Sequence, residues 1–172
     1  DAARSYETRP VVVNDSLVSI LSGYPEVKHV QRYSTKPGMI KTAEDFQGMV
    51  LKGVGPEFDP AFFREHLVEG ELPQFSDTAS SNRVIISKAL ATKLRLKLGD
   101  KIDTYYIQDD IRARRLQIAG IYQTNFSEYD NLFLLTDLYL VNRLNNWKPE
   151  QVSGAELQVH DYDRLEATTY QI

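Results

Sequence analysis

Three histidines are the first residues to consider for metal chemistry, because imidazole nitrogen is a common zinc ligand. His29, His66 and His160 lie far apart in the sequence, and none has a partner at a zinc-site spacing such as H-E-x-x-H. Glu65 and Glu69 lie close to His66, but two ligands do not close a metal site. Packed or solvated histidines therefore explain the pattern better than metal ligands do.

Two acidic pairs could in principle act as a general acid and a general base, if a pocket held them at the right separation. Asp109 and Asp110 fall where a hairpin turn is predicted, and Glu128 and Asp130 fall in a predicted loop. Ser87 lacks the G-x-S-x-G context of a hydrolase nucleophile and suits the cap of a helix. Turn, loop and cap roles are therefore favoured over catalysis.

A cluster of arginines follows the predicted turn. Arg112 and Arg114 are two positions apart, so both project from one face of a strand. Ion pairs with Asp109 and Asp110 on an exposed face are the favoured interpretation, and binding of an anionic partner stays open as the alternative. Phe126 and Tyr129 could add an exposed aromatic patch. The candidate partner-binding residues are Arg112, Arg114, Asp109, Asp110, Phe126 and Tyr129.

The composition excludes several classes of protein. The chain has 172 residues, of which 42% are hydrophobic and 26% charged, enough for one domain or two closely packed small ones. A net charge of -4 argues against a nucleic-acid partner. No apolar run approaches the ~20 residues that cross a bilayer, and the polar start has no signal-peptide pattern. The absence of cysteine excludes disulfides, a thiol nucleophile and a cysteine metal site.

The middle of the chain predicts a strand, a helix and a hairpin in succession. An apolar run at 84–86 precedes a helix that Ser87 caps and that ends near Arg95. Alternating residues then predict strands at 101–107 and 112–123, joined by a tight link at 108–111. The hairpin is expected to bury one face.

The flanking segments predict further strands and helices. Expected strands are 6–13, 27–34, 39–42, 46–54, 132–135 and 155–159. Expected helices begin at Asn14 or Asp15, at Asp59 (ending at Gly70), at Thr136, and at Asp161 or Asp163. Residues 73–82 are rich in Ser, Thr, Asp and Asn and predict a loop.

Several short sequence motifs occur in a fixed order that resembles the periplasmic core domain of ABC-transporter permeases of the macrolide-exporter and lipoprotein-releasing type. The resemblance covers most of the chain, and its specificity lies in the order and spacing of many weak motifs. These motifs are Lys52-Gly53-Val54, Glu69-Gly70-Glu71-Leu72-Pro73, Ile85-Ile86-Ser87, Leu90-Ala91, Leu94, Leu98-Gly99-Asp100, Ile118-Ala119-Gly120-Ile121, Glu128-Tyr129-Asp130 and Val152-Ser153-Gly154.

This resemblance implies an α+β fold with two parts. The two ends of the chain would form a porter-like β-α-β subdomain, and the middle would be an inserted, mixed α/β, sabre-like subdomain. The implied boundaries are 1–54 for the first porter half, 55–150 for the insertion and 151–172 for the start of a second, truncated half. The domain would lie on the periplasmic face of the bacterial inner membrane.

The same resemblance implies a function without catalysis, cofactor or metal. The domain would couple ATP-driven movement of membrane helices to export or lipoprotein release. Its implied partners are the transmembrane helices of the same permease, a separate ABC ATPase, a second permease protomer, and a periplasmic adaptor, chaperone or lipoprotein. A stand-alone periplasmic module that binds a ligand or protein is the alternative, and a hydrolase comes third.

Two geometric expectations follow from the resemblance. Lipoprotein-releasing relatives hook a soluble carrier with a long hairpin, and the link at 108–111 is too short for that arm. The opening strand 6–13 and the closing strand 152–160 should share one sheet, because a tie between the two ends would transmit helix motion. The Asp109-Asp110 turn should lie far from both ends.

Overall fold

The computed structural model describes residues 6–160. Ten strands and five helices occur within these residues. In chain order they are β1 (Val11–Val12), α1 (Asp15–Ser22), β2 (Val27–Lys41), β3 (Phe46–Val54), α2 (Ala61–His66), β4 (Leu67–Gly70), β5 (Arg83–Ser87), α3 (Lys88–Leu94), β6 (Lys101–Ile107), β7 (Ile111–Tyr122), α4 (Ser127–Asp130), β8 (Phe133–Asp137), α5 (Leu138–Leu144), β9 (Gln151–Val152) and β10 (Gly154–Val159).

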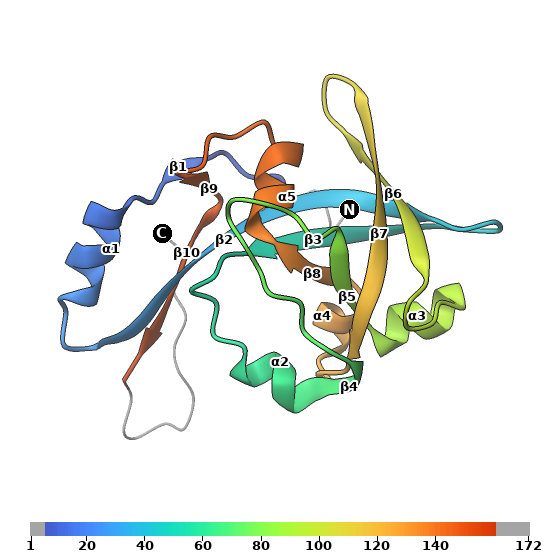
Figure 1. Cartoon of the computed structure of the whole chain (residues 1–172), viewed down its shortest axis with the longest axis horizontal. Helices are drawn as coiled ribbons and strands as arrows, with labels where there is room; N and C mark the ends of the chain where they lie inside the picture. The colour runs from blue at the N-terminus through green and yellow to red at the C-terminus, as the bar shows by residue number, and fades with distance from the viewer. Residues whose placement is uncertain (1–5, 161–172) are drawn as a thin grey trace.

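A mixed eight-stranded sheet organises the molecule (Figure 1). Its order is β10-β2-β3-β8-β5-β7-β4, and β6 pairs with both β2 and β7. The β3–β8 and β5–β7 pairs are parallel, and the other pairs are antiparallel. A separate two-stranded sheet joins β1 to β9. The α+β class predicted from the sequence is therefore confirmed as a mixed sheet with helices packed against it.

Strand β2 is a single element of 15 residues, whereas the sequence predicted two strands separated near Pro37 and Gly38. On one edge, β10 pairs with residues 27–33 and β6 with residues 39–41, so the stretch between them has no strand on that side. A proline is tolerated there because that edge requires no ladder hydrogen bond. In Figure 1, β2 runs from the side of α1 and β10 to the β6–β7 hairpin.

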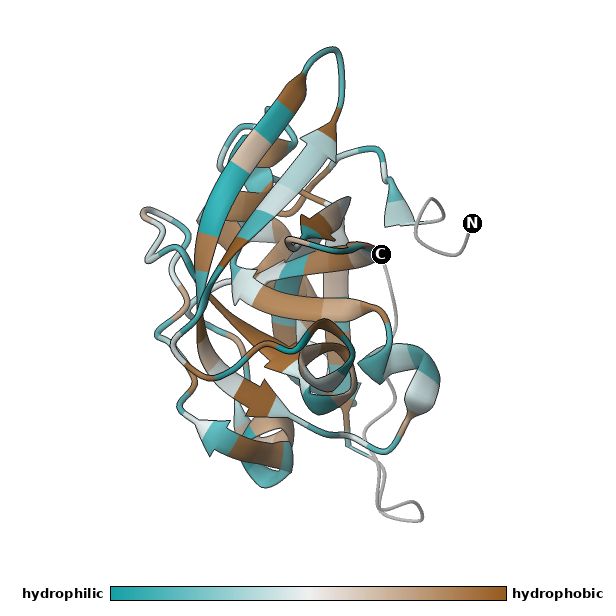
Figure 2. Ribbon diagram, turned by 90° about the vertical axis from the view of Figure 1, so that its right-hand side faces the viewer, coloured by the Kyte–Doolittle hydropathy of each residue, from teal (hydrophilic) through white to brown (hydrophobic). Residues whose placement is uncertain are grey.

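The β6–β7 hairpin buries one face, as its alternation predicts. Ile102, Thr104 and Tyr106 are buried, and their neighbours in the strand are exposed or half-buried. On the same side of the sheet, α3 contributes Leu90 and α5 contributes Leu144 to one hydrophobic cluster. Figure 2 shows hydrophobic residues along the interior strands and hydrophilic residues on helix surfaces and loops. The predicted bounds of β6 are confirmed, and β7 begins one residue earlier than predicted.

The predicted end of one helix and the predicted N-cap of another are wrong. The helix that begins after Asp59 stops at His66, and Leu67 turns into β4, which pairs with the edge of β7. The last helix before β9 is capped by Asp137, whose Oδ1 accepts from Leu140 N at 2.8 Å, and not by Thr136. Thr136 Oγ1 instead donates a hydrogen bond to the carbonyl oxygen of Arg83, at 2.9 Å. Both errors come from tertiary contacts, which local patterns do not contain.

Other caps agree with the sequence. Asn14 caps α1, one of the two residues predicted, and Ser87 caps α3. α3 ends at Leu94, in agreement with the predicted end near Arg95, and the C-cap Arg95 takes the left-handed conformation that glycine usually supplies (φ 57). The one-turn helix α4 was not predicted. The predicted final helix at Asp161 or Asp163 lies outside the described residues.

Segments near the two described ends of the chain meet, but not in the predicted way. Only Val11–Val12 of the expected opening strand is a strand, since Pro10 precedes it and β9 offers two residues to pair with. Val11 pairs with Val152, whereas Leu157 lies in β10 of the large sheet. The prediction that the opening and closing strands share one sheet is therefore wrong for β10. The closing strand is interrupted at Ser153, so β9 pairs with β1 and β10 joins the large sheet. Val11 and Leu157 nevertheless pack against one hydrophobic cluster. No helix within residues 6–160 is long and apolar enough to span a membrane.

Candidate functional site

Two segments near the ends of the described chain, residues 6–12 and 151–153, meet at the middle of β2. Thr8 Oγ1 lies 2.6 Å from Ser153 Oγ, and Ser153 Oγ accepts a hydrogen bond from the backbone N–H of Thr35 at 3.0 Å. Thr35 Oγ1 in turn donates to the carbonyl of Tyr6 at 2.8 Å. We call this junction the terminal clamp, formed by Tyr6, Thr8, Val11, Thr35, Val152 and Ser153.

An apolar layer supports the terminal clamp. Val13, Val30 and Val152 are buried in one cluster with Leu138 of α5 and Ala155 of β10. Half-buried residues of α1 and β10 pack against this cluster. The two ends are therefore joined by hydrogen bonds and by a shared hydrophobic contact, which makes the clamp part of the folded core.

The tip of the β6–β7 hairpin carries the charged residues that the sequence singled out. Arg112 Nε lies 3.7 Å from Asp110 Oδ1, so the predicted ion pair with the turn forms, at long range. Its shorter contacts are to the end of α5, where its guanidinium donates to the carbonyl of Arg143 and to Asn146 Oδ1, both at 2.9 Å. Arg112 therefore holds the hairpin against α5.

The rest of the charged cluster is arranged differently from the prediction. Arg114 donates to the carbonyl of Ala113 at 2.8 Å and forms no ion pair in the described part of the chain. Asp109, on the turn, likewise has no ion pair there. The short cross-strand pair is Arg115 with Asp103, at 3.0 Å, which face each other in the β6–β7 register. The partner aspartate thus comes from the opposite strand, as antiparallel register dictates.

Phe126 and Tyr129 do not form a common exposed patch. Phe126 is 65% exposed, whereas Tyr129 is half-buried and stacks on Phe133, with ring centroids 4.6 Å apart. Burial raises the pKa of the Tyr129 hydroxyl. Tyr129 therefore belongs to the aromatic packing around Phe63 and Tyr122.

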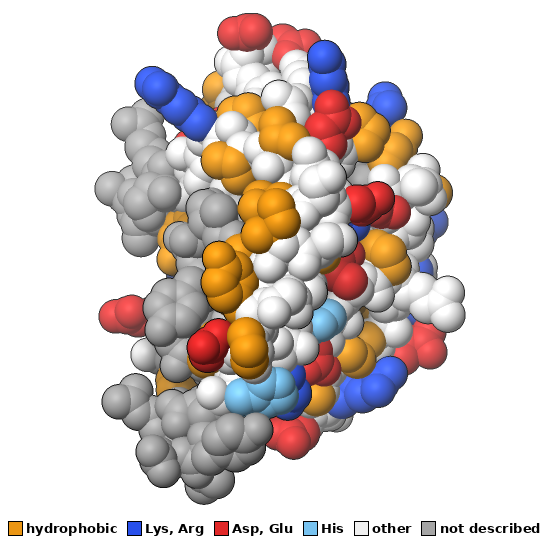
Figure 3. All heavy atoms as spheres, turned by 90° about the vertical axis from the view of Figure 1, so that its left-hand side faces the viewer, with side chains coloured by type: hydrophobic (Ala, Val, Ile, Leu, Met, Phe, Trp, Pro, Cys, Tyr) orange, Lys and Arg blue, Asp and Glu red, His pale blue; other side chains and the backbone are white. Residues whose placement is uncertain are grey.

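Exposed hydrophobic residues occur at several places, and two of them are the hairpin tip and the area around α1. At the hairpin tip, Ile107 and Ile111 are each 71% exposed and face each other in register. Around α1, the exposed residues are Val12, Ile20 and Tyr24. Figure 3 shows hydrophobic side chains across the middle of the face on the α1 side of the molecule. Both surfaces are candidates for contact with other proteins.

Partly buried ion pairs connect β2 to loops and β3 to β10. Arg32 donates to Glu57 Oε2 at 2.7 Å and to Asp77 Oδ2 at 2.8 Å. Burial opposes ionisation of Glu57, but the hydrogen bonds from Arg32 outweigh it, so the pKa of Glu57 is lowered. Lys52 of β3 reaches across β2 to Glu156 of β10 at 2.5 Å. These pairs fix loops and strands and present no free acid or base.

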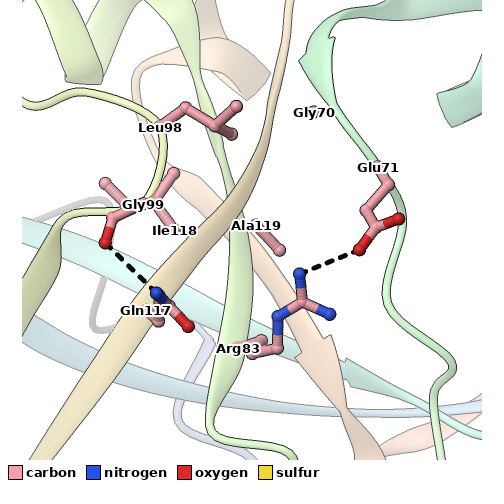
Figure 4. A pocket seen from close by; sticks show the side chains of 8 residues that line it. All are labelled: Gly70, Glu71, Arg83, Leu98, Gly99, Gln117, Ile118 and Ala119. Atoms are coloured by element: carbon pink, nitrogen blue, oxygen red, sulfur yellow. Dashed lines mark hydrogen bonds and ion pairs between the residues drawn. The ribbon is translucent and has the colours of Figure 1, made fainter.

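A shallow pocket of about 330 Å³ lies where β7 passes from β6 to β4 (Figure 4). Arg83 points across it to Glu71, at 3.1 Å, and Gln117 Nε2 donates to the carbonyl of Gly99 at 3.3 Å. Leu98, Ile118 and Ala119 supply its apolar wall. Its two charged groups neutralise each other, so the pocket lacks an acid–base pair and a nucleophile.

The other candidates for chemistry have structural partners. His29 Nε2 lies 2.6 Å from the carbonyl of Glu57, and His66 stacks on Phe62. Ser87 donates to the carbonyl of Asp130 and accepts from Leu90 N. Among residues 6–160, no three His, Asp or Glu side chains are grouped to hold a metal ion.

The MacB-like periplasmic core domain family model matches residues 3–172. The chain belongs to this family. The resemblance found in the sequence is therefore confirmed. The chain is accordingly the periplasmic domain of a MacB-like ABC transporter permease, a family of transporter components and not of known enzymes.

Two solved structures show the same fold. The extracellular domain of the noncanonic ABC-type transporter YknZ from Gram-positive bacteria has a TM-score of 0.62 and 16% identity, covering 90% of this chain and 75% of that one. The periplasmic region of MacB from Actinobacillus actinomycetemcomitans has a TM-score of 0.60 and 13% identity, covering 95% and 72%. No curated protein matches the chain.

Proposed function

We propose that this MacB-like domain couples ATP-driven movement of the permease's membrane helices to export or lipoprotein release on the periplasmic side. The observation that carries the proposal is the terminal clamp, in which residues 6–11 and residues 152–153 bind each other and β2. If both ends lead to membrane helices, movement of the helix before residue 6 reaches the core through this junction. Movement of the helix after residue 160 reaches it through β10, which pairs with residues 27–33 of β2 and leads back to the clamp at Ser153.

Strand β2 gives the clamp a mechanical connection to the rest of the sheet. Its 15 residues extend over roughly 45–50 Å at strand rise. It pairs with β10 at one end and with β3 and β6 at the other. Packed interiors have low compressibility, so a displacement at Thr35 moves the sheet as a body.

The division into parts inferred from the resemblance fits this arrangement as a proposal. Residues 1–54 and 151–172 would be the porter halves, and 55–150 the sabre-like insertion. The parallel β3–β8 ladder joins the first half to the insertion within one sheet. Motion of the halves would therefore be carried into the insertion by backbone hydrogen bonds.

The proposed docking end for a periplasmic adaptor, chaperone or lipoprotein is the hairpin tip. It combines Ile107 and Ile111, which are exposed, with the carboxylates of Asp109 and Asp110. Arg112 braces the tip on α5. Phe126 is a second exposed contact point, whereas Arg114 and Tyr129 support their neighbours. A separate ABC ATPase and a second permease protomer complete the proposed complex.

The test uses the full permease with its ATPase, in cells whose own copy is deleted. A loosened clamp, Thr8→Ala with Ser153→Ala, removes the hydroxyls that join the two ends. A locked clamp, Val12→Cys with Gln151→Cys, joins residues that face each other in register. No cysteine within these 172 residues competes for the disulfide. Glu44→Gln, on the exposed β2–β3 turn, is the control.

We expect the loosened clamp to keep basal ATP hydrolysis and lose complementation of transport. The oxidised, locked clamp should keep both activities. If the loosened clamp transports like the control, or if the lock abolishes transport, the ends do not work as one junction and the proposal fails.

A further inference from the structure

Lys36 of β2 is a buried cation whose side chain takes no part in the hydrogen bonds of the terminal clamp. Its side chain has no solvent exposure, and its Nζ lies 2.7 Å from Glu7 Oε1. The Glu7 side chain is 50% exposed and belongs to the segment that leads into the clamp. A buried ammonium is tolerated only when it is paired and hydrogen-bonded. The burial of Lys36 therefore depends on a carboxylate at the edge of the molecule.

The turn of the β6–β7 hairpin covers Lys36 from the other side. When the side-chain amide of Gln108 is oriented so that its oxygen faces Lys36, that oxygen accepts from Lys36 Nζ at 2.7 Å and the nitrogen donates to the carbonyl of Leu144 at 3.2 Å. The two hydrogen bonds from Arg112 reach the same end of α5. Lys36 thus bridges residue 7 and the hairpin turn. The expectation that the Asp109-Asp110 turn lies far from both ends is therefore wrong for the described N-terminal segment.

Polar contacts dominate the attachment of this turn. Tyr106 is the last fully buried side chain of β6, and the next apolar residues, Ile107 and Ile111, are each 71% exposed. Little apolar area therefore holds the turn down beyond Tyr106. The docking of Gln108 depends on whether Lys36 can remain buried beneath it.

We propose that the Glu7–Lys36 contact is a latch that controls docking of the β6–β7 turn. With Glu7 in place, the charge of Lys36 is compensated and Gln108 covers it. When residues 6–8 are displaced and Glu7 is withdrawn, only a neutral amide faces the buried ammonium. Undocking of the turn then admits water to Lys36, which removes the cost of an unpaired charge.

The part of this inference that concerns transport rests on the proposed function, because movement of the membrane helices would be what displaces residues 6–8. The latch would then convert that movement into release of the hairpin tip. The Ile107–Ile111 pair and the acidic turn would be freed from α5 together. The tip would thereby be presented to a partner in one state of the transport cycle and withheld in the other.

Hydrogen exchange of the 172-residue chain, without ATP or membrane, tests the latch alone. Glu7→Gln keeps the shape of the side chain and removes its charge. We expect it to speed exchange of the hairpin amides around residues 106–112 at least about tenfold, because one partner of a buried pair is lost. Amides of β5 should change by less than about twofold. Glu44→Gln is the matched control, since Glu44 is exposed on a turn.

Lys36→Met supplies the decisive second variant, because it removes the buried charge and fills a similar volume. In this background, Glu7→Gln should change hairpin exchange by less than about twofold. The latch is excluded if Glu7→Gln leaves hairpin exchange like that of the control, or speeds it equally with Met at position 36. It is also excluded if β5 amides speed up as much as the hairpin, because that result means loss of global stability.

The two proposals can fail separately. Unchanged exchange in Glu7→Gln would refute the latch and leave coupling through the clamp intact. Normal transport by the loosened clamp would refute coupling and leave the latch as a property of the isolated fold.

Discussion

A methyl group added at Gly38 should destabilise the packing of the β6–β7 hairpin against β2. An ideal Cβ at this position lies 2.5 and 2.6 Å from two ring carbons of Tyr106, and 3.0 Å from the carbonyl oxygen of Tyr105. Tyr106 is 1% exposed and packs in the main hydrophobic cluster. The ring therefore has no free space to move into, and the backbone of β6 limits the alternative shift.

The expected cost follows from these contacts. Overpacking of a well-packed core costs about 1–3 kcal/mol, and we expect Gly38→Ala in the upper half of that range, since ring and backbone atoms are both too close. For a domain of this size, such a loss lowers Tm by roughly 5–10 °C. Gly48→Ala is the matched control on the neighbouring strand, because no atom lies within 4 Å of its added Cβ. It should be neutral or stabilising by up to about 1 kcal/mol.

Urea unfolding followed by circular dichroism measures both variants in wild-type and Tyr106→Leu backgrounds. The penalty of Gly38→Ala should shrink when the ring is absent, and the effect of Gly48→Ala should stay the same. Equal stabilities of Gly38→Ala and Gly48→Ala, within about 0.5 kcal/mol, would refute the packing argument.

Three further predictions follow from single features of the structure. Tyr106→Phe should raise stability by up to about 1 kcal/mol in urea unfolding, because the Tyr106 hydroxyl is buried without a hydrogen-bond partner among the described residues; a loss of stability would contradict this. Stability should fall above about pH 10, by up to about 1.4 kcal/mol per pH unit for each tyrosine, because burial raises the pKa of four phenols and only the unfolded chain releases their protons there. A flat profile between about pH 9 and about pH 11 would exclude this linkage, which involves Tyr33, Tyr106, Tyr122 and Tyr129. Finally, a purified lipoprotein carrier should form no tight complex that Asp109→Ala and Asp110→Ala abolish, because the turn after Ile107 is too short for a hook; such a complex in pull-down experiments would prove this wrong.

The sequence predicted what is encoded locally. The alternation of β6 identified its bounds and its buried face, because Ile102, Thr104 and Tyr106 follow the strand period. Ser87 identified the start of α3, because a capping hydroxyl acts on a backbone N–H only three residues away. Family membership could also be predicted, because many short motifs in a fixed order identify the family although none of them is catalytic.

The remaining features depend on contacts between distant segments. The continuity of β2 through Pro37 depends on which edge of the strand is unpaired. The role of Arg112 depends on the end of α5, which lies 31 residues away in sequence at Arg143. Lys36 lies between the strands predicted at 27–34 and 39–42, and nothing local signals its burial. Ser153 lies within the Val152-Ser153-Gly154 motif, so the resemblance indicated this position. It did not reveal the hydrogen bonds of Ser153 to Thr8 and Thr35.

The most direct test of the coupling account measures how far residue 44, at the far end of β2, stands above the bilayer. A spin label at Glu44→Cys and labelled lipid head groups would report this height in the reconstituted permease, with and without trapped nucleotide. The account predicts a height that changes between the two states with the intact terminal clamp, and a constant height with Thr8→Ala and Ser153→Ala while ATP hydrolysis continues. The same nucleotide-dependent change with the clamp loosened would contradict it.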